Sequence, residues 1–525
     1  MLNKTIALSL AIGMALFAIP ALAAPLTLHT RDRVKTSEWV PPEKAHTKLD
    51  IPVSERPFTF VYKTQEWDSA KTAIIVCDMW NDLKNKIPAD RVAELAVEMN
   101  EVLKAAREKG VLIIHAPSAT VDFYKDTPQR ARCLNAPVVE TDPPLQWNYL
   151  NKDREAELPV DDSDNGWEGP VLEGRPQTRQ HPAIEIGEND AIGHEKEVYY
   201  LLKEEGIENV ILMGVHTNMC VLGRPFGIRQ LTYLGMNVAL MRDMTDSLYN
   251  PEMEPKVSHY RGTEMIIEHI EKYWCPTVLS TDFTSKPAFR FSGDTRPRVV
   301  FMVSDDHYHG DKTLPEFAQM LREEAGIDAL VLHGEGGNDI PGTANFATAD
   351  AVFVFVRRLG LPPEQIKALQ DYVASGGAIL GLRTASHAFK IKFAPDGSYE
   401  LPEGQAEWTT FDHDILGGNY NNHQANDLKL DIKNVNSIHP VMEGVTPAEW
   451  RSKGSLYNTA PIADDATLLQ EGTVPGVTEP VTWIREAVPG RGKVFYSSLG
   501  YPEDFKEQQF RQMLVNAIKW AVKDN

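Results

Sequence analysis

The sequence predicts an α/β fold made of two doubly wound domains, each with a mostly parallel sheet flanked by helices. Three observations support this prediction. Short apolar runs, typical of buried parallel strands, recur in both halves of the chain. Segments with apolar residues at helical spacing separate these runs, as βαβ units require. A polar, proline-containing stretch at 283–297 divides the two alternating regions and indicates a linker between domains.

The length and composition agree with a globular protein of several domains. A chain of 525 residues is long enough for about two to four domains. Its 42% hydrophobic content can form sizeable cores. We expect a signal peptide at 1–23 and an extended N-terminal segment at 24–60. A first domain at 61–282, a linker at 283–297 and a second domain at 298–525 should follow.

The N-terminus has the features of a secretory signal peptide. Lys4 supplies a positive charge, and residues 6–19 form an apolar core that Pro20 interrupts. Small residues then offer a cleavage site near Ala23. An uncleaved anchor helix is the alternative, but the apolar run is short for crossing a bilayer. We therefore expect a secreted or periplasmic protein with no stable membrane insertion after cleavage.

The formal net charge of -21 at pH 7 restricts the partners of the protein. Nucleic acids and anionic membranes attract basic proteins, so general electrostatics argue against both. The expected partner is a small-molecule substrate. The sequence does not decide whether the protein forms a homo-oligomer.

The first domain alternates strands and helices from residue 72 onward. A long insertion at 117–182 has little periodicity, and loops of this length in compact domains often serve as lids or interfaces. Strands are expected at 72–77, 111–115, 210–213 and 237–241, and helices at 90–109, 195–205, 220–234 and 259–274.

Two of the predicted strands lead to residues that can carry chemistry. Asp78 directly follows the strand at 72–77, and the strand at 210–213 turns at Gly214 toward Cys220. Parallel α/β sheets place their sites at the carboxyl ends of the strands. Cys220 also begins a predicted helix, whose dipole would favour the reactive thiolate. The alternative is a small buried cysteine that fills the corner between strand and helix.

Residues 61–280 resemble the isochorismatase-like cysteine hydrolases. The resemblance rests on the acid at one strand end and on the segments 214–221 and 242–246. It implies a doubly wound α/β fold and a Cys-Asp-Lys triad. On this chain, Cys220 would be the nucleophile and Asp78 the general base.

The resemblance also implies an oxyanion site and a pocket. A cis peptide bond would precede His216, and backbone N–H groups near Val215, His216 and Cys220 would hold the oxyanion. Trp80 and His216 are candidate pocket walls, and a core position for Trp80 is an equal alternative.

The third member of the triad is missing from its expected place. The family would place its lysine at 183–190, and this stretch has none. The nearest lysines, Lys196 and Lys203, lie inside the next predicted helix.

Four cysteines occur in the chain. Cys77 lies in a predicted core strand and Cys220 at the candidate site. Cys133 and Cys275 are therefore the only plausible disulfide pair in an oxidising compartment, and the sequence leaves their pairing undecided.

A second alternation of strands and helices begins at residue 298. Strands are expected at 298–303, 328–332, 351–356 and 378–382, and helices at 314–324 and 363–374. This half resembles the ThuA-like family, relatives of class I glutamine amidotransferases associated with sugar metabolism. The resemblance implies a flavodoxin-type α/β domain and rests on motifs at 376–382, 416–420, 438–441, 480–483 and 490–500.

Arg383 stands where the amidotransferases carry a nucleophilic cysteine. Arginine stays protonated, so this domain is not expected to run glutaminase chemistry. Tyr501 likewise stands where the family often has a histidine. A buried arginine needs a partner, and Asp305 or Asp306 at the end of the first strand is the expected one. The functional alternative places Arg383 in a pocket for an anion or a polyol.

Several histidines also follow predicted strand ends in this half. Histidine clusters can bind a divalent metal or hydrogen-bond sugar hydroxyls. Their spacing matches no standard zinc signature, so we predict no metal site and no cofactor, with a divalent metal in the second domain as the alternative. The expected second-domain pocket consists of His307, His309, Arg383, His387 and His423.

The sequence thus predicts an exported hydrolase that cleaves an amide-type C–N bond of a small molecule through Cys220. A second domain would handle a sugar derivative. The missing lysine and Arg383 favour one alternative, a catalytically inactive or ligand-binding protein. The other alternative is that the ThuA-like domain carries the chemistry and acts on a carbohydrate.

Overall fold

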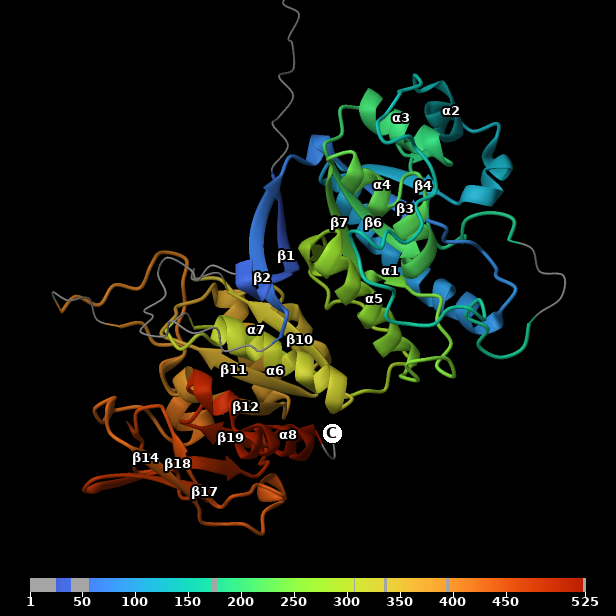
Figure 1. Ribbon diagram of the computed structural model, residues 1–525. Helices are drawn as coiled ribbons and strands as arrows, with labels where there is room; N and C mark the ends of the chain where they lie inside the picture. The colour runs from blue at the N-terminus through green and yellow to red at the C-terminus, as the bar shows by residue number, and fades with distance from the viewer. Residues whose placement is uncertain are drawn as a thin grey trace, which may run out of the picture.

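The computed structural model describes residues 25–38, 56–171, 177–305, 307–334, 338–392 and 397–522. The expected signal peptide at 1–23 and residues 39–55 of the N-terminal segment lie outside the described residues. The chain forms two lobes, each built on one large sheet, the first coloured blue to green and the second yellow to red (Figure 1). Over the described ranges, no helix has the length and apolar character needed to cross a membrane.

The first lobe is built on an eight-stranded sheet. Six neighbouring strands of this sheet, β8, β7, β6, β3, β4 and β5, are parallel. β1 comes from the N-terminal segment and pairs antiparallel with both β2 and β8, so the described part of this segment is extended, as expected. In spatial order the strands are β2 (Phe58–Trp67), β1 (Leu26–Lys35), β8 (Thr277–Val278), β7 (Asn237–Asp246), β6 (Asn209–Val215), β3 (Thr72–Cys77), β4 (Leu112–Ala116) and β5 (Ala191–Ile192).

Helices cover both faces of this sheet. Alternate residues of a strand point to opposite faces, so Ile74 and Val76 of β3 share a core with α1, while Ala73, Ile75 and Cys77 lie in the opposite core. This burial on both sides explains the continuous apolar run of β3. The first face carries α1 (Lys86–Glu108), and the second carries α2 (Pro128–Asn135), α3 (Lys196–Glu204), α4 (Ile228–Tyr233) and α5 (His259–Tyr273).

The second lobe has a nine-stranded sheet with two distinct halves. The five strands β10, β9, β11, β12 and β19 are parallel, and the sequence predicted the first four of these. Four antiparallel strands extend the sheet beyond β19. In spatial order the strands are β10 (Asp328–His333), β9 (Arg298–Ser304), β11 (Ala351–Val356), β12 (Ala378–Leu382), β19 (Val494–Ser497), β18 (Val477–Arg485), β17 (Ala466–Val474), β14 (Leu430–Asn434) and β15 (Glu449–Ser452).

Helices also cover both faces of the parallel half. Phe301 and Phe353 share one core with α6 and α8, and Val300 and Val352 share the other with α7. A separate two-stranded sheet lies beside the carboxyl ends of the parallel strands. The elements are α6 (Gly310–Glu324), α7 (Pro363–Ala374), α8 (Gln508–Val522), β13 (Asn422–His423) and β16 (Tyr457–Asn458).

Two helices differ from their predicted bounds. α1 begins at Lys86 rather than at residue 90, because the side chain of Asn85 accepts a hydrogen bond from the N–H of Ile87 and caps the helix. The helix predicted at 220–234 is interrupted. Only α4 is a regular helix there, because Pro225 lacks an N–H and disfavours a continuous helix.

The two lobes are joined by packed contacts. The β1–β2 hairpin lies between them (Figure 1), and Arg33 of β1 donates to Gln319 of α6 at 3.1 Å. Tyr62 of β2 stacks on His333 with ring centroids 4.8 Å apart. The predicted linker at 283–297 also packs against both lobes rather than crossing solvent, because its Phe291 and Ala288 enter the cores of the first and second lobe respectively.

Candidate active site

Asp78 and Cys220 lie at the carboxyl ends of adjacent strands. Cys77 pairs with Gly214 in the register of β3 and β6, so the residues that follow these strands start side by side. Gly214 has φ +105, and a Cβ there would lie 2.1 Å from the carbonyl oxygen of Cys77. Only glycine allows this close approach. Asp78 itself has φ 48, a left-handed conformation that reverses the chain at the strand end.

A third residue, Arg224, completes the group. Its Nη2 and Nε donate to Oδ2 of Asp78 at 2.9 and 3.2 Å, and its Nη1 pairs with Glu195 at 2.9 Å. The Cys220 thiol and the Ser118 hydroxyl lie against the same carboxylate. Asp78 is fully buried and Cys220 is 8% exposed.

Arg224 supplies the positive charge that the triad lysine would supply. Lys196 and Lys203 are both exposed on α3. One feature of the sequence points to Arg224, its position four residues after Cys220. That spacing places two side chains on the same side of a helical turn. Because the resemblance implies a lysine at 183–190, the spacing of Arg224 from Cys220 was not recognised as a site feature.

The surroundings of Cys220 disfavour the thiolate that the sequence led us to expect. Burial raises the pKa of Cys220, and the negative charge of Asp78 raises it further. Arg224 lowers this pKa but does not offset both effects. The expected dipole effect fails because Cys220 is the fourth residue of the turn Thr217–Val221 and does not lie at the start of a long helix.

The Asp78 carboxylate has the properties of a base. Burial raises its pKa above the ordinary value, and Arg224 acts against this increase. A carboxylate with a raised pKa accepts a proton more readily, and the adjacent guanidinium stabilises its charged form. The burial of the pair thus favours the thiol of Cys220 and makes Asp78 a stronger base, while Arg224 favours the charged carboxylate.

The segment before Cys220 has the expected backbone. The Val215–His216 peptide bond is cis, as the resemblance implied. Val215 is buried in β6, and the backbone N–H of His216 points to the Cys220 thiol. Burial lowers the pKa of the His216 ring to about 4, so the ring is neutral at physiological pH. Trp80 belongs to a hydrophobic core and donates from Nε1 to the carbonyl of Pro117 at 2.9 Å.

The long insertion at 117–182 covers this group. The ring of Trp147 lies 5.3 Å from the guanidinium carbon of Arg224. The N–H of Asn148 donates to the carbonyl of Gly223 at 2.7 Å. A buried carboxylate, Glu155, anchors the same insertion to the body of the lobe. The insertion is therefore a packed part of the site.

Arg383 lies fully buried among tyrosines in the second lobe. Its guanidinium carbon is 4.1 Å from the ring centroid of Tyr308, 4.6 Å from that of Tyr457 and 5.7 Å from that of Tyr501. It donates to the carbonyl of Ser498 at 2.9 Å. These rings supply cation–π contacts to a charge that has lost its water.

The expected ion pair between Arg383 and Asp305 is wrong. Asp305 accepts instead from the Thr384 hydroxyl at 2.7 Å and from the backbone N–H of His307 at 2.7 Å. Asp305 therefore has hydrogen-bond donors close by in the chain or in space, and tyrosine rings rather than this carboxylate surround Arg383. Asp306, the other expected partner, lies outside the described residues.

Three of the expected histidines contact these tyrosines or a neighbouring one. His307 lies 4.6 Å from the ring of Tyr308, and His387 lies 4.6 Å from the ring of Tyr420. Nδ1 of His423 forms a hydrogen bond with the hydroxyl of Tyr420 at 2.6 Å.

His309 occupies a left-handed position at the start of α6 and is buried. Burial, reinforced by nearby arginines, lowers the pKa of His387 well below its usual value, so this ring is neutral. Within the described ranges, no group of three or more His, Cys, Asp or Glu side chains is placed to hold a metal ion. The four cysteines are all buried and free, Cys133 and Cys275 included.

Comparisons with known proteins agree with the two lobes. Residues 72–259 match the isochorismatase domain family, and residues 299–521 match the ThuA family, described as trehalose utilisation. The fold and the site thus define a two-domain α/β protein with an isochorismatase-like first domain. Its second domain is ThuA-like. No curated protein matches the chain.

Several solved structures are similar to one half of the chain each. A ThuA-like protein from Bacteroides uniformis has 15% identity and a TM-score of 0.34, covering 46% of this chain and 96% of its own. A cysteine hydrolase from Pseudomonas syringae pv. phaseolicola has 16% identity and a TM-score of 0.28, covering 41% and 91%. An isochorismatase family protein from Desulfovibrio vulgaris has 16% identity and a TM-score of 0.23, covering 38% and 89%.

Proposed function

We propose that the first domain hydrolyses an amide-type C–N bond of a small molecule through Cys220. The arrangement of Cys220 beside Asp78, with Arg224 bound to the same carboxylate, carries this proposal. An isochorismatase-like domain with a buried thiol and a buried carboxylate at adjacent strand ends is suited to nucleophilic acyl transfer.

The reaction takes place in two steps. The Cys220 sulfur attacks the carbonyl carbon while Asp78 takes the thiol proton, and the C–N bond then breaks as Asp78 gives this proton to the leaving amine. Water attacks the resulting thioester, Asp78 accepts a proton from the water, and the released thiolate recovers it. Backbone N–H groups near His216 and Cys220 stabilise the oxyanion in both steps. Arg224 keeps Asp78 ionised between them.

The test is release of ammonia or amine from a panel of amides, ureides and carbamoyl compounds. Wild-type protein should turn over at least one of them, and the Cys220→Ser variant should not, because a serine hydroxyl is far less acidic than a thiol. The Cys133→Ser variant is a matched control, since it removes another buried cysteine from the same lobe. Equal turnover by C220S would rule out the nucleophile. A wild type that binds panel members without turnover would favour a ligand-binding protein.

We also infer that the ThuA-like domain binds a polyol such as a sugar derivative. Tyrosine faces and neutral histidines around Arg383 support this inference, because sugars stack on aromatic rings and hydrogen-bond to imidazoles. Sugar-dependent increases in melting temperature should be lost in Arg383→Met, and R383M that still responds like wild type would contradict the assignment.

We propose finally that the protein is exported, as the residues up to Ala23 suggest. The mass of the protein recovered from a periplasmic extract should correspond to a chain that begins near residue 24. Full-length protein in the cytoplasm alone would contradict export.

A further inference from the structure

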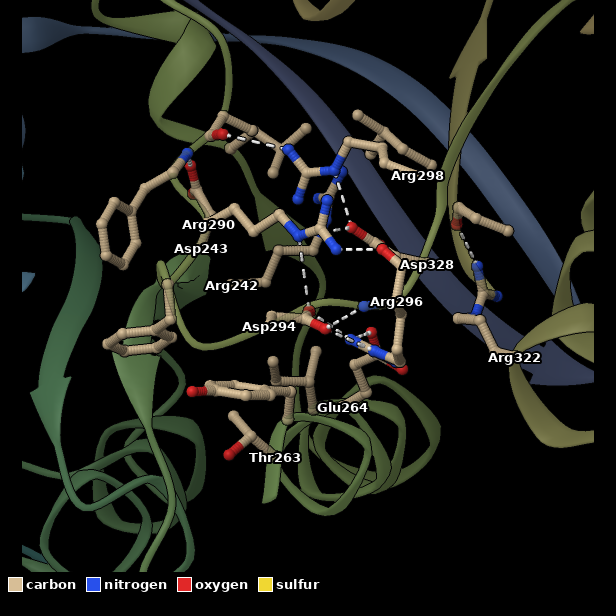
Figure 2. A pocket seen from close by; sticks show the side chains of 18 of the residues that line it. Arg242, Asp243, Thr263, Glu264, Arg290, Asp294, Arg296, Arg298, Arg322 and Asp328 are labelled. Carbon is tan, nitrogen blue, oxygen red and sulfur yellow. Dashed lines mark hydrogen bonds and ion pairs between the residues drawn. The ribbon is translucent and has the colours of Figure 1, made fainter. Parts of the chain in front are cut away.

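A cavity of about 140 Å³ lies between the two lobes, apart from Cys220 and from Arg383. Three parts of the chain line it. β7 and α5 contribute from the first lobe, the 283–297 linker closes one side, and α6 and β10 contribute from the second lobe. Figure 2 shows arginine side chains of the linker beside Asp294 and Asp328 in this space.

Six arginines and five carboxylates line the cavity, the carboxylates being Asp243, Glu264, Glu268, Asp294 and Asp328. Three of its arginines are neutralised by direct hydrogen bonds to carboxylates. Arg298 donates to Asp328 at 2.6 Å, and Arg296 donates to Asp294 at 2.7 Å. Arg31 donates to a glutamate of α5 at 2.8 Å. The full set of lining arginines is Arg31, Arg242, Arg290, Arg296, Arg298 and Arg322.

The other three arginines make no hydrogen bond to a carboxylate among the described residues. Arg242 has a single hydrogen bond, from Nη1 to the hydroxyl of Thr277 at 3.2 Å. Arg322 donates only to the carbonyl of Ala329 and to the side chain of Gln319. Arg290 forms longer ion pairs with Asp294 and Asp328, its Nε lying 3.6 and 3.7 Å from their oxygens, and its Nη2 donates to the carbonyl of Arg296.

Burial makes the charges of Arg242 and Arg322 costly. Burial lowers the pKa of Arg242 and of Arg322 to about 10, and the charge of Arg31 adds to the effect on both. Both side chains nevertheless remain positively charged at neutral pH. Glutamates of α5 act on both charges but form no hydrogen bond to either arginine among the described residues, and an anion in the cavity would lower the remaining cost of burial. Water alone would fill the space, at about 30 Å³ per molecule, without neutralising them.

We propose that this cavity binds a small oxyanion with two negative charges, carried either by a phosphate group or by a pair of carboxylates. Arg242 and Arg290 donate to it from the first lobe and the linker, and Arg322 faces it from the second lobe. Guanidinium groups suit this role because their paired N–H groups match phosphate and carboxylate oxygens. Because the ligand contacts both lobes, it stabilises their arrangement.

The test is isothermal titration of the full-length protein with inorganic phosphate and, separately, with succinate, in Tris chloride at constant ionic strength. Saturable binding of one or both is expected, together with a higher melting temperature. Phosphate binding alone would identify a phosphate site, and succinate binding alone a dicarboxylate site. Absence of saturable binding by either would overturn the proposal.

Three variants locate the site. Arg242→Gln should weaken binding at least about tenfold, the effect of losing one charge-assisted hydrogen bond. Arg290→Gln, whose side chain is only partly buried, provides the same test if R242Q does not fold. Arg451→Gln removes an exposed arginine far along the second sheet and should bind as wild type does. Wild-type affinity in the folded Arg242 or Arg290 variant would overturn the proposal.

Discussion

Arg224 binds the same Asp78 oxygen through two nitrogens, Nη2 at 2.9 Å and Nε at 3.2 Å. This pairing fixes the carboxylate between a permanent positive charge and the Cys220 thiol. A guanidinium also does not lose its proton in the accessible pH range, so Arg224 can orient and stabilise Asp78 but cannot act as an acid. Asp78 is therefore the member of this pair that can accept and return a proton.

The Arg224→Met variant should shift the acidity of Cys220. Arg224 lowers the pKa of the thiol, so its removal should raise that pKa and slow alkylation by iodoacetamide at a given pH. Asp78→Asn should have the opposite effect, because the Asp78 charge raises the same pKa. The measurement is the pH dependence of the alkylation rate, with the labelled cysteine identified by peptide mass spectrometry. A shift in the same direction in both variants would contradict this electrostatic account.

Substitution of Gly223 should disturb the cover over the site. A Cβ at this position would lie 2.9 Å from Cε2 of Trp147 and 3.1 Å from the carbonyl oxygen of Asn148. Gly223→Ala should therefore displace Trp147 from Arg224 and cost about 1–3 kcal/mol of stability, as overpacking does. Tryptophan fluorescence and melting temperature together measure the change. An alanine variant with the spectrum and stability of wild type would show that the cover tolerates the added carbon.

Glu155 should be essential for the stability of the insertion. It is 3% exposed and accepts hydrogen bonds from Arg229 at 3.0 Å, His269 at 2.8 Å and Trp274 at 2.7 Å. Glu155→Gln leaves the arginine without its buried counter-charge, which costs about 3–5 kcal/mol.

Urea unfolding measures this loss. Glu157→Gln, in which an exposed glutamate nearby is changed in the same way, should unfold at the wild-type concentration of urea. Equal stability of the two variants would mean that the insertion is not held by Glu155.

Stability should fall in mildly alkaline solution because of His259. Burial opposes protonation of this ring, but Asp246 at 2.7 Å and Glu168 outweigh burial and raise the pKa of His259 to about 9. The folded protein thus holds a proton that the unfolded chain releases near pH 6.5. The stabilisation is complete below about pH 6.5 and is lost as pH rises through 9, a change of roughly 3 kcal/mol.

The free energy of unfolding between pH 6 and 10 measures this effect. His259→Gln should remove the corresponding slope, whereas His413→Gln, at an exposed histidine, should retain it. A slope that persists in H259Q would assign the pH dependence to another group.

Strand and helix alternation was predictable because both sheets are buried on two faces. The apolar runs at Thr72–Cys77 and Ala351–Val356 can be satisfied only in such a setting, and the structure has strands with these bounds. The antiparallel strands beyond β19 were not predicted. β17, for example, alternates buried and exposed residues and contains Gly472, so it has no continuous apolar run.

The candidate site was predictable only in part. Asp78 and Cys220 could be placed together because the ends of neighbouring parallel strands converge. The cation on Asp78 was not predictable in this way, because the family resemblance implies a lysine at a remote strand end, whereas Arg224 follows Cys220 by four residues. Tyr308 and Tyr457 were missed for a different reason. Nothing local in the sequence marks them, and their role depends on the buried guanidinium of Arg383 between their rings.

The central claim is that Cys220 forms a thioester with the acyl group of an amide substrate. Intact-protein mass spectrometry after acid quenching measures this directly for each compound of the amide and ureide panel. The account predicts an adduct of acyl mass on Cys220 in wild-type and C133S protein, and none in C220S. Turnover of a panel compound with no adduct on Cys220, or an adduct that persists in C220S, would contradict it.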